Sequence, residues 1–84
     1  MTSNTVKIGT SDILIHSATA NEYVHLGLGE RSDFVTISIV RGGSSITSYT
    51  LTNFQSTNAF GLESGDEIHA ICPEGNGIVG IVKI

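Results

Sequence analysis

Apolar and polar residues alternate with a period of two along most of this chain. In residues 34–40, FVTISIV, every second position from the first valine onward is β-branched and apolar. Alternation of this kind is typical of a strand with one buried and one exposed face. It recurs at 12–15 and 23–28, and residues 78–84 form an almost continuous apolar run. The sequence therefore predicts an all-β fold.

Glycine-rich turns separate these segments. Arg41-Gly42-Gly43-Ser44 joins two β-branched segments of similar length. Paired glycines supply the positive φ that a tight hairpin turn requires, so we predict a β-hairpin across this site. The segment PEGNG predicts another reversal, and IVGIVKI predicts a strand in the centre of a sheet or at a subunit interface.

One short helix is predicted between the hairpin and the second half of the chain. Thr52 and Gln55 fit the capping box S/T-x-x-E/Q, in which two side chains bond free N–H groups at a helix start. The helix would span roughly residues 53–60, with Phe54 and Phe60 as core anchors. Asparagine and threonine are poor helix formers, so packing would have to hold it.

The composition indicates one small domain, residues 1–84, that assembles with copies of itself. Only 14% of the 84 residues are charged, against about 25% in typical soluble domains. A chain of this length buries a limited core, and oligomerisation is a common source of further stability. We therefore expect a homo-oligomer.

The net charge of −4 limits the classes of partner. No basic patch is present, which argues against nucleic acid and against an anionic membrane surface. The amino terminus lacks a signal-peptide pattern and no apolar run reaches membrane-spanning length. The expected location is the cytoplasm.

The segment GLESGDEIHAI gives the chain a resemblance to a known family. Over residues 34–84 the chain resembles the molbindins and TOBE domains, which are small molybdate-binding β-barrels. The shared order is a hairpin, a short helix, this motif and a closing apolar strand. The resemblance implies a small closed or partly open barrel of the OB type with one short helix, assembled as a homo-oligomer. The matching positions are 34–40, 42–43, 46–48, 60–62, 65–68 and 70–71.

The same resemblance implies a non-catalytic protein that binds molybdate, tungstate or a similar oxyanion for storage or homeostasis. A dianion in a dry cleft needs several N–H and O–H donors and one or two cations. In the family these groups meet between subunits, and no other cofactor is implied. The residues that the resemblance assigns to the ligand are Ser3, Asn4, Lys7, Thr47, Ser48 and Thr50.

Other function classes stay open. The family's opening arginine and the lysine expected near Cys72 are both absent, which favours an oligomeric structural or interaction module without an anion site. An enzyme has less support, because no acid–base pair or activated nucleophile stands out. Swapped-hairpin DNA-binding regulators share the GLxxGDEI pattern, but their basic residues are missing here.

No metal site is predicted. His16, His25 and His69 are not spaced as ligands on one element. The acids of ESGDE, residues 63–67, suit a solvated turn better than a calcium site, which needs about six oxygens. The single cysteine, Cys72, is expected to be a small buried hydrophobic residue.

Overall fold

The structure is a computed structural model that describes residues 2–28, 32–52, 55–57 and 59–84. The described residues form strands and no helix, so the all-β prediction is confirmed. The strands are β1 (Thr2–Ile8), β2 (Ile13–Ser17), β3 (Glu22–Leu28), β4 (Val35–Arg41), β5 (Ser44–Leu51), β6 (Phe60–Leu62), β7 (Glu67–Ile71) and β8 (Gly77–Lys83).

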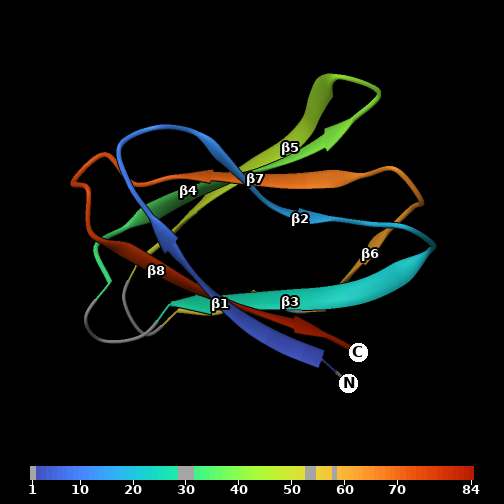
Figure 1. Ribbon diagram of the computed structural model, residues 1–84, viewed down its shortest axis with the longest axis horizontal. Coiled ribbons are helices and arrows are strands. Elements are labelled where there is room, and N and C mark those ends of the chain that lie inside the picture. The colour runs from blue at the N-terminus through green and yellow to red at the C-terminus, as the bar shows by residue number, and fades with distance from the viewer. Residues whose placement is uncertain (1, 29–31, 53–54, 58) are drawn as a thin grey trace.

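The strands form two four-stranded antiparallel sheets, with orders β1-β8-β3-β6 and β2-β7-β4-β5. Figure 1 shows the first sheet in the lower half of the view and the second above it. β8 pairs with both β1 and β3, which confirms a central position for the terminal apolar run. Neither sheet is closed into a barrel, so of the predicted closed or partly open barrel the closed form is wrong.

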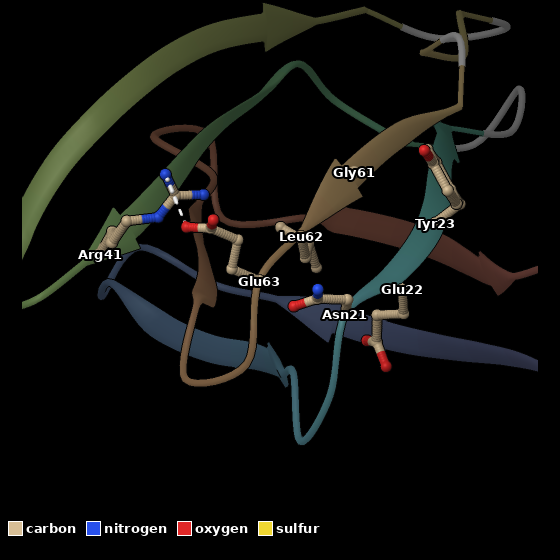
Figure 2. A pocket seen from close by; sticks show the side chains of 7 residues that line it. All are labelled: Asn21, Glu22, Tyr23, Arg41, Gly61, Leu62 and Glu63. Carbon is tan, nitrogen blue, oxygen red and sulfur yellow. Dashed lines mark ion pairs between the residues drawn. The ribbon is translucent and has the colours of Figure 1, made fainter.

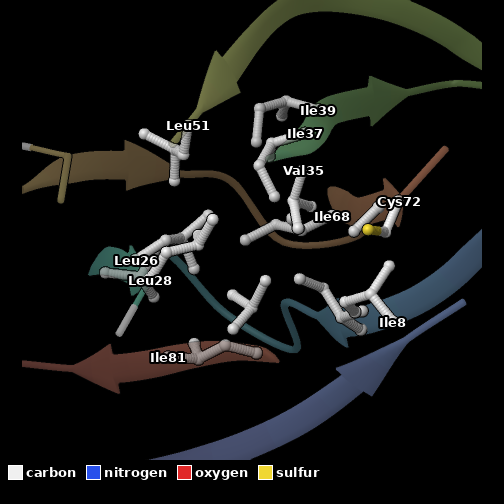
Figure 3. Close-up of a cluster of buried hydrophobic side chains, with 14 of the residues drawn as sticks. Ile8, Leu26, Leu28, Val35, Ile37, Ile39, Leu51, Ile68, Cys72 and Ile81 are labelled. Carbon is white, nitrogen blue, oxygen red and sulfur yellow. The ribbon is translucent and has the colours of Figure 1, made fainter. Parts of the chain in front are cut away.

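The core lies between the sheets and is built from alternate residues of both. β3 and β8 contribute from one sheet, and β4 and β7 contribute from the other (Figure 3). Cys72, which follows β7, is fully buried among them as predicted. Burying a valine, leucine or isoleucine side chain contributes about 1.5–3 kcal/mol, so this alternation is the main source of stability.

The hairpin predicted at Gly42 and Gly43 is confirmed. It joins β4 to β5, and the two glycines have φ values of 61° and 82°, which non-glycine residues rarely adopt. The β5 strand has one irregularity. Val40 pairs with Ser45 and Ile39 pairs with Thr47, so Ile46 is the extra residue of a β-bulge.

The predicted helix at 53–60 is wrong in its described part, and Phe54 lies outside the described residues. Half of the capping box does form, because the side chain of Gln55 accepts a hydrogen bond from the N–H of Thr52 at 2.8 Å. The segment then runs beside β3 instead of coiling. Leu28 N–H donates to the carbonyl of Gln55, and Thr57 N–H donates to the carbonyl of Leu26, both at 2.8 Å. Pairing with β3 satisfies these backbone groups better than a helix of weak formers would.

Gly77 lies where the chain packs closely around β8. A Cβ at this position would lie 2.8 Å from Val35 Cγ2, and 3.0 Å from the Cβ atoms of Cys72 and Ile8. Two of these three atoms are attached directly to backbone, so they cannot move aside without shifting a strand. Gly80, three residues along the same strand, has room: its nearest neighbour would be a carbonyl oxygen of Gly27 at 3.8 Å.

Gly77→Ala is expected to lower the free energy of unfolding by about 1–3 kcal/mol, the usual cost of overpacking. Gly80→Ala is the matched control on the same strand. It should change the free energy by less than about 0.5 kcal/mol. Urea denaturation followed by circular dichroism measures both. Equal effects of the two substitutions would contradict the packing argument.

Candidate functional site

The residues predicted to bind an oxyanion fall into two separate groups. Ser3, Asn4 and Lys7 lie on β1, and the other three lie on β5. β1 and β5 are outer strands of different sheets. One chain therefore does not bring the six residues together, and a site containing all of them would need a second copy.

The pleat divides the β5 group again. Thr47 pairs with the buried Ile39, so Thr47 faces the inner side of the sheet. Ser48 and Thr50 pair with Ser38 and Thr36 on the outer side. Thr47 therefore cannot contact the same small ion as Ser48 within one chain.

The outer side of this sheet carries a row of hydroxyl groups beside His69. Thr36 and Thr50 hydroxyl oxygens are 3.5 Å apart, and His69 pairs across the strands with Ser38. His69 itself is engaged by carboxylates at both ring nitrogens, each at 3.1 Å: Glu67 at Nε2 and Asp12 at Nδ1. Glu67, and then Asp12, raise the pKa of His69. Both ring nitrogens of His69 are therefore paired with carboxylates, and the ring offers no unpaired positive charge to the row of hydroxyl groups.

The histidines do not converge. His16 on β2 bonds to the side chain of Glu22, and His25 lies on β3. Within the described ranges no three His, Cys, Asp or Glu side chains are arranged to hold a metal ion. In the same ranges, no helix has the length and apolar character needed to cross a membrane.

A polar hollow lies where the amino end of β3, β6 and the carboxyl end of β4 meet. We call it the Arg41 hollow; its volume is about 330 Å³. Figure 2 shows Arg41 on one side of it and Tyr23 on the other. The residues that line it are Asn21, Glu22, Tyr23, Arg41, Gly61, Leu62 and Glu63.

Arg41 is fixed in this hollow by a buried carboxylate. Its Nε donates to Asp66 Oδ1 at 2.8 Å, and its Nη2 donates to Asp66 Oδ2 at 2.7 Å. Asp66 is 1% exposed and also accepts the backbone N–H of Glu63 at 2.8 Å. The Arg41 guanidinium, followed by this N–H, lowers the pKa of Asp66 from 3.8 to about 2. Such two-point pairing fixes both the position and the plane of the guanidinium.

The acidic side chains of the turn at 63–67 thus pair with side chains of the protein, and their clustering requires no bound metal ion. Asp66 and Glu63 both face Arg41, since Glu63 Oε2 lies 3.0 Å from Nη1, while Glu67 faces His69. Arg41 and Asp66 were missed by the sequence reasoning. Arg41 precedes a glycine turn and Asp66 follows one, but nothing in the sequence links two residues 25 positions apart.

The second distinctive feature is the free edge of β5. The strand has eight residues, SSITSYTL, without a charge or a proline, and among the described residues only β4 pairs with it. The other three outer strands have features that discourage edge pairing. β1 carries Lys7, β2 is bulged between Leu14 and His16, and β6 has three residues.

An apolar hollow of about 320 Å³ adjoins the same edge. Tyr49 and Phe60 meet there edge to face, with ring centroids 6.3 Å apart. Tyr49 is half-buried, and its burial raises the pKa of its phenol group. The lining residues are Tyr49, Leu51, Thr57, Ala59 and Phe60.

The low pKa of Asp66 predicts acid-sensitive stability. A carboxyl whose folded pKa is depressed stabilises the protein above its ordinary pKa of 3.8, and this contribution is lost as the pH falls through about 2. The difference in unfolding free energy between wild type and Asp66→Asn should therefore shrink from about pH 5 to about pH 2. Urea denaturation at several pH values measures it.

Glu74→Gln serves as the control for this measurement, because Glu74 is exposed and the substitution likewise replaces a carboxylate by its amide. Its difference from wild type should stay nearly constant over the same pH range. A constant difference for Asp66→Asn as well would show that the Arg41–Asp66 pair does not couple folding to pH.

Comparison of the chain with protein families, curated proteins and solved structures gives no match. The resemblance to molbindins and TOBE domains therefore stays a prediction.

Proposed function

We propose that this protein is a non-catalytic interaction module whose copies join edge to edge through β5. The observation that carries the proposal is the uncharged, unprotected outer edge of this strand. Unpaired backbone N–H and C=O groups of such an edge bond readily to another strand. The edge is also self-complementary, because it holds no charge to repel its own copy.

A two-fold axis at Tyr49 gives the longest regular pairing. After the bulge at Ile46, residues 47–51 pair with β4 without interruption. Antiparallel pairing about this axis sets Thr47 opposite Leu51 of the second copy, and Ser48 opposite Thr50. Paired residues then face the same side in both copies, so the two sheets would continue as one.

The apolar hollow supplies the remaining contact area. A stable interface buries about 800 Å² on each partner, which is about a sixth of the 4804 Å² surface of this chain. Five paired strand residues do not reach that area alone. Under the proposed axis the hollows of the two copies flank the new strand pair on its inner side. Tyr49 and Phe60 are the type of aromatic residue that dominates interface energy.

Sedimentation velocity tests this assembly. Wild-type protein is expected at twice the 8.8 kDa chain mass. Ser48→Lys should weaken association about tenfold, because the two new ammonium groups would be diagonal neighbours about 7–8 Å apart on one face, a repulsion of about 1–2 kcal/mol. A wild-type monomer at millimolar concentration would reject the proposal.

Ser17→Lys is the matched control. Ser17 is also an exposed serine on an outer strand, β2, and the substitution changes the net charge equally. It should leave the mass at that of wild type. Equal dissociation of both variants would mean that charge in general, and not the β5 edge, controls association.

Oxyanion binding between copies is the second candidate function. It is favoured by the exposed Lys7, which makes no ion pair within the described residues, and by the exposed hydroxyls of Ser48 and Thr50. Such a site would need β1 of one copy against β5 of the next. That contact is head to tail and forms a ring where its rotation closes, whereas pairing of β5 with β5 stops at a dimer.

Thermal unfolding with molybdate, tungstate or sulfate separates the two candidates. A ligand at a hundredfold excess over its Kd stabilises the native state by about 2.7 kcal/mol, or roughly 10–20 °C for a domain of this size. The second candidate predicts this shift with molybdate or tungstate only, a ring-sized mass, and loss of the shift in Lys7→Ala. A dimer with no shift would support the interaction module alone.

A further inference from the structure

The Arg41 hollow presents one guanidinium whose orientation is already set. Asp66 holds Nε and Nη2, so Nη1 is the nitrogen left for another partner. The Asp66 carboxylate is buried and is itself held by the N–H of Glu63. A ligand at Nη1 would therefore not have to immobilise the arginine. Immobilising a flexible side chain costs conformational entropy and so weakens binding.

A carboxylate already occupies the remaining position. Glu63 Oε2 lies 3.0 Å from Arg41 Nη1, but the Glu63 side chain is 65% exposed and that of Arg41 is 45% exposed. Exposed ion pairs of this type contribute little, because water and salt screen them. The contact with Glu63 thus shows that Nη1 can bind a carboxylate. Because this ion pair is weak, the carboxylate of a ligand can replace that of Glu63.

The charge around the hollow favours a single negative charge on the ligand. Asp66 is neutralised by Arg41, and Glu22 is engaged by His16 and by Lys83 Nζ at 3.5 Å. The His16 contact, with a smaller part from Lys83, lowers the pKa of Glu22. With Glu63 displaced, Arg41 Nη1 still offers its N–H groups, but the charge of Arg41 is balanced by Asp66. A site without a surplus positive charge, in a chain of net charge −4, suits a monoanion better than a dianion such as phosphate.

The rest of the hollow provides a polar group and an aromatic surface. Asn21 Oδ1 accepts a hydrogen bond from Ser64 N–H at 3.3 Å, which leaves the amide N–H groups as donors. The ring of Tyr23, a 62% exposed residue, lies beside Gly61, where a Cβ would be 3.5 Å from Tyr23 Cε1. A side chain at Gly61 would contact this ring, and glycine leaves that space empty; Figure 2 shows where the two residues lie.

We propose that the Arg41 hollow binds the carboxylate of a small organic acid or of a peptide, in exchange for Glu63. Arg41 Nη1 donates to the carboxylate, Asp66 positions the guanidinium, and Tyr23 contacts an apolar body attached to the acid. The volume of about 330 Å³ is at the lower end of the range for ligand pockets. This site lies within one chain and goes beyond the proposed function.

Titration with benzoate, followed by amide and arginine side-chain NMR signals, tests the site. Benzoate should shift the signals of Arg41 Nε–H, Gly61 and Glu63, and its neutral isostere benzamide should not. Glu63→Gln removes the internal competitor and should tighten benzoate binding about fivefold, the equivalent of about 1 kcal/mol for an exposed ion pair. Glu74→Gln makes the same charge change in the turn between β7 and β8 and should leave the affinity within about twofold.

Three outcomes would overturn the proposal: equal shifts with benzamide, no tightening in Glu63→Gln, or tightening by the same factor in Glu74→Gln. A blocked dipeptide with a free carboxyl terminus, compared with its amide, shows whether a peptide or only a small acid is accepted. Running the titration in Ser48→Lys keeps this test separate from assembly, because binding within one chain should persist in a monomer.

Discussion

The carboxylate of Asp66 is the group on which one whole end of the molecule depends. It is buried, so it must be fully hydrogen-bonded, and it receives two bonds from Arg41 and one from the N–H of Glu63. The backbone of the same turn bonds to Ala18: Ala18 N–H donates to the Asp66 carbonyl, and Gly65 N–H donates to the Ala18 carbonyl, both at 2.8 Å. One side chain and one short turn thus join the end of β4, the β6–β7 connection and the segment between β2 and β3.

This arrangement also determines what the surface near Arg41 can do. Because Asp66 fixes the guanidinium from the buried side, the arginine has a defined direction at the surface. A lysine at this position could not be held at two points in a plane. The β5 edge depends on the same anchor, since Arg41 is the last residue of β4 before the hairpin turn. Fixing Arg41 fixes the base of the hairpin that carries the exposed strand.

The sequence was sufficient for those features that follow from local rules. Alternation predicted β2, β3 and β4, and the glycines at 42 and 43 predicted the hairpin, because both depend only on neighbouring residues. The helix prediction failed although its capping interaction at Thr52 formed. The backbone beyond it found partners on β3, which lies about thirty residues earlier in the chain. A local signal does not reveal competition of that kind.

The candidate site was less predictable, for two different reasons. Thr47 and Ser48 are adjacent on a strand, so the strand period alone implies that they face opposite sides of the sheet. The family resemblance nevertheless assigned both residues to one ligand. The Arg41–Asp66 pair could not have been deduced, because the partners come together only through the pairing of β4 with β7. An ion pair between two strands that are far apart in the chain produces no periodic pattern in the sequence.

The pairing of β1 with β8 gives the molecule a mechanical property. Thr2 lies opposite Lys83, and the ladder runs from there to Ile8 opposite Gly77. Both ends of the chain therefore meet at one corner (Figure 1). Tension applied between Thr2 and Lys83 would load the hydrogen bonds of this ladder one pair at a time, as in unzipping, and not all together as in shear. Pulled by its ends, the fold would yield at low force, and β1 would peel from the sheet first.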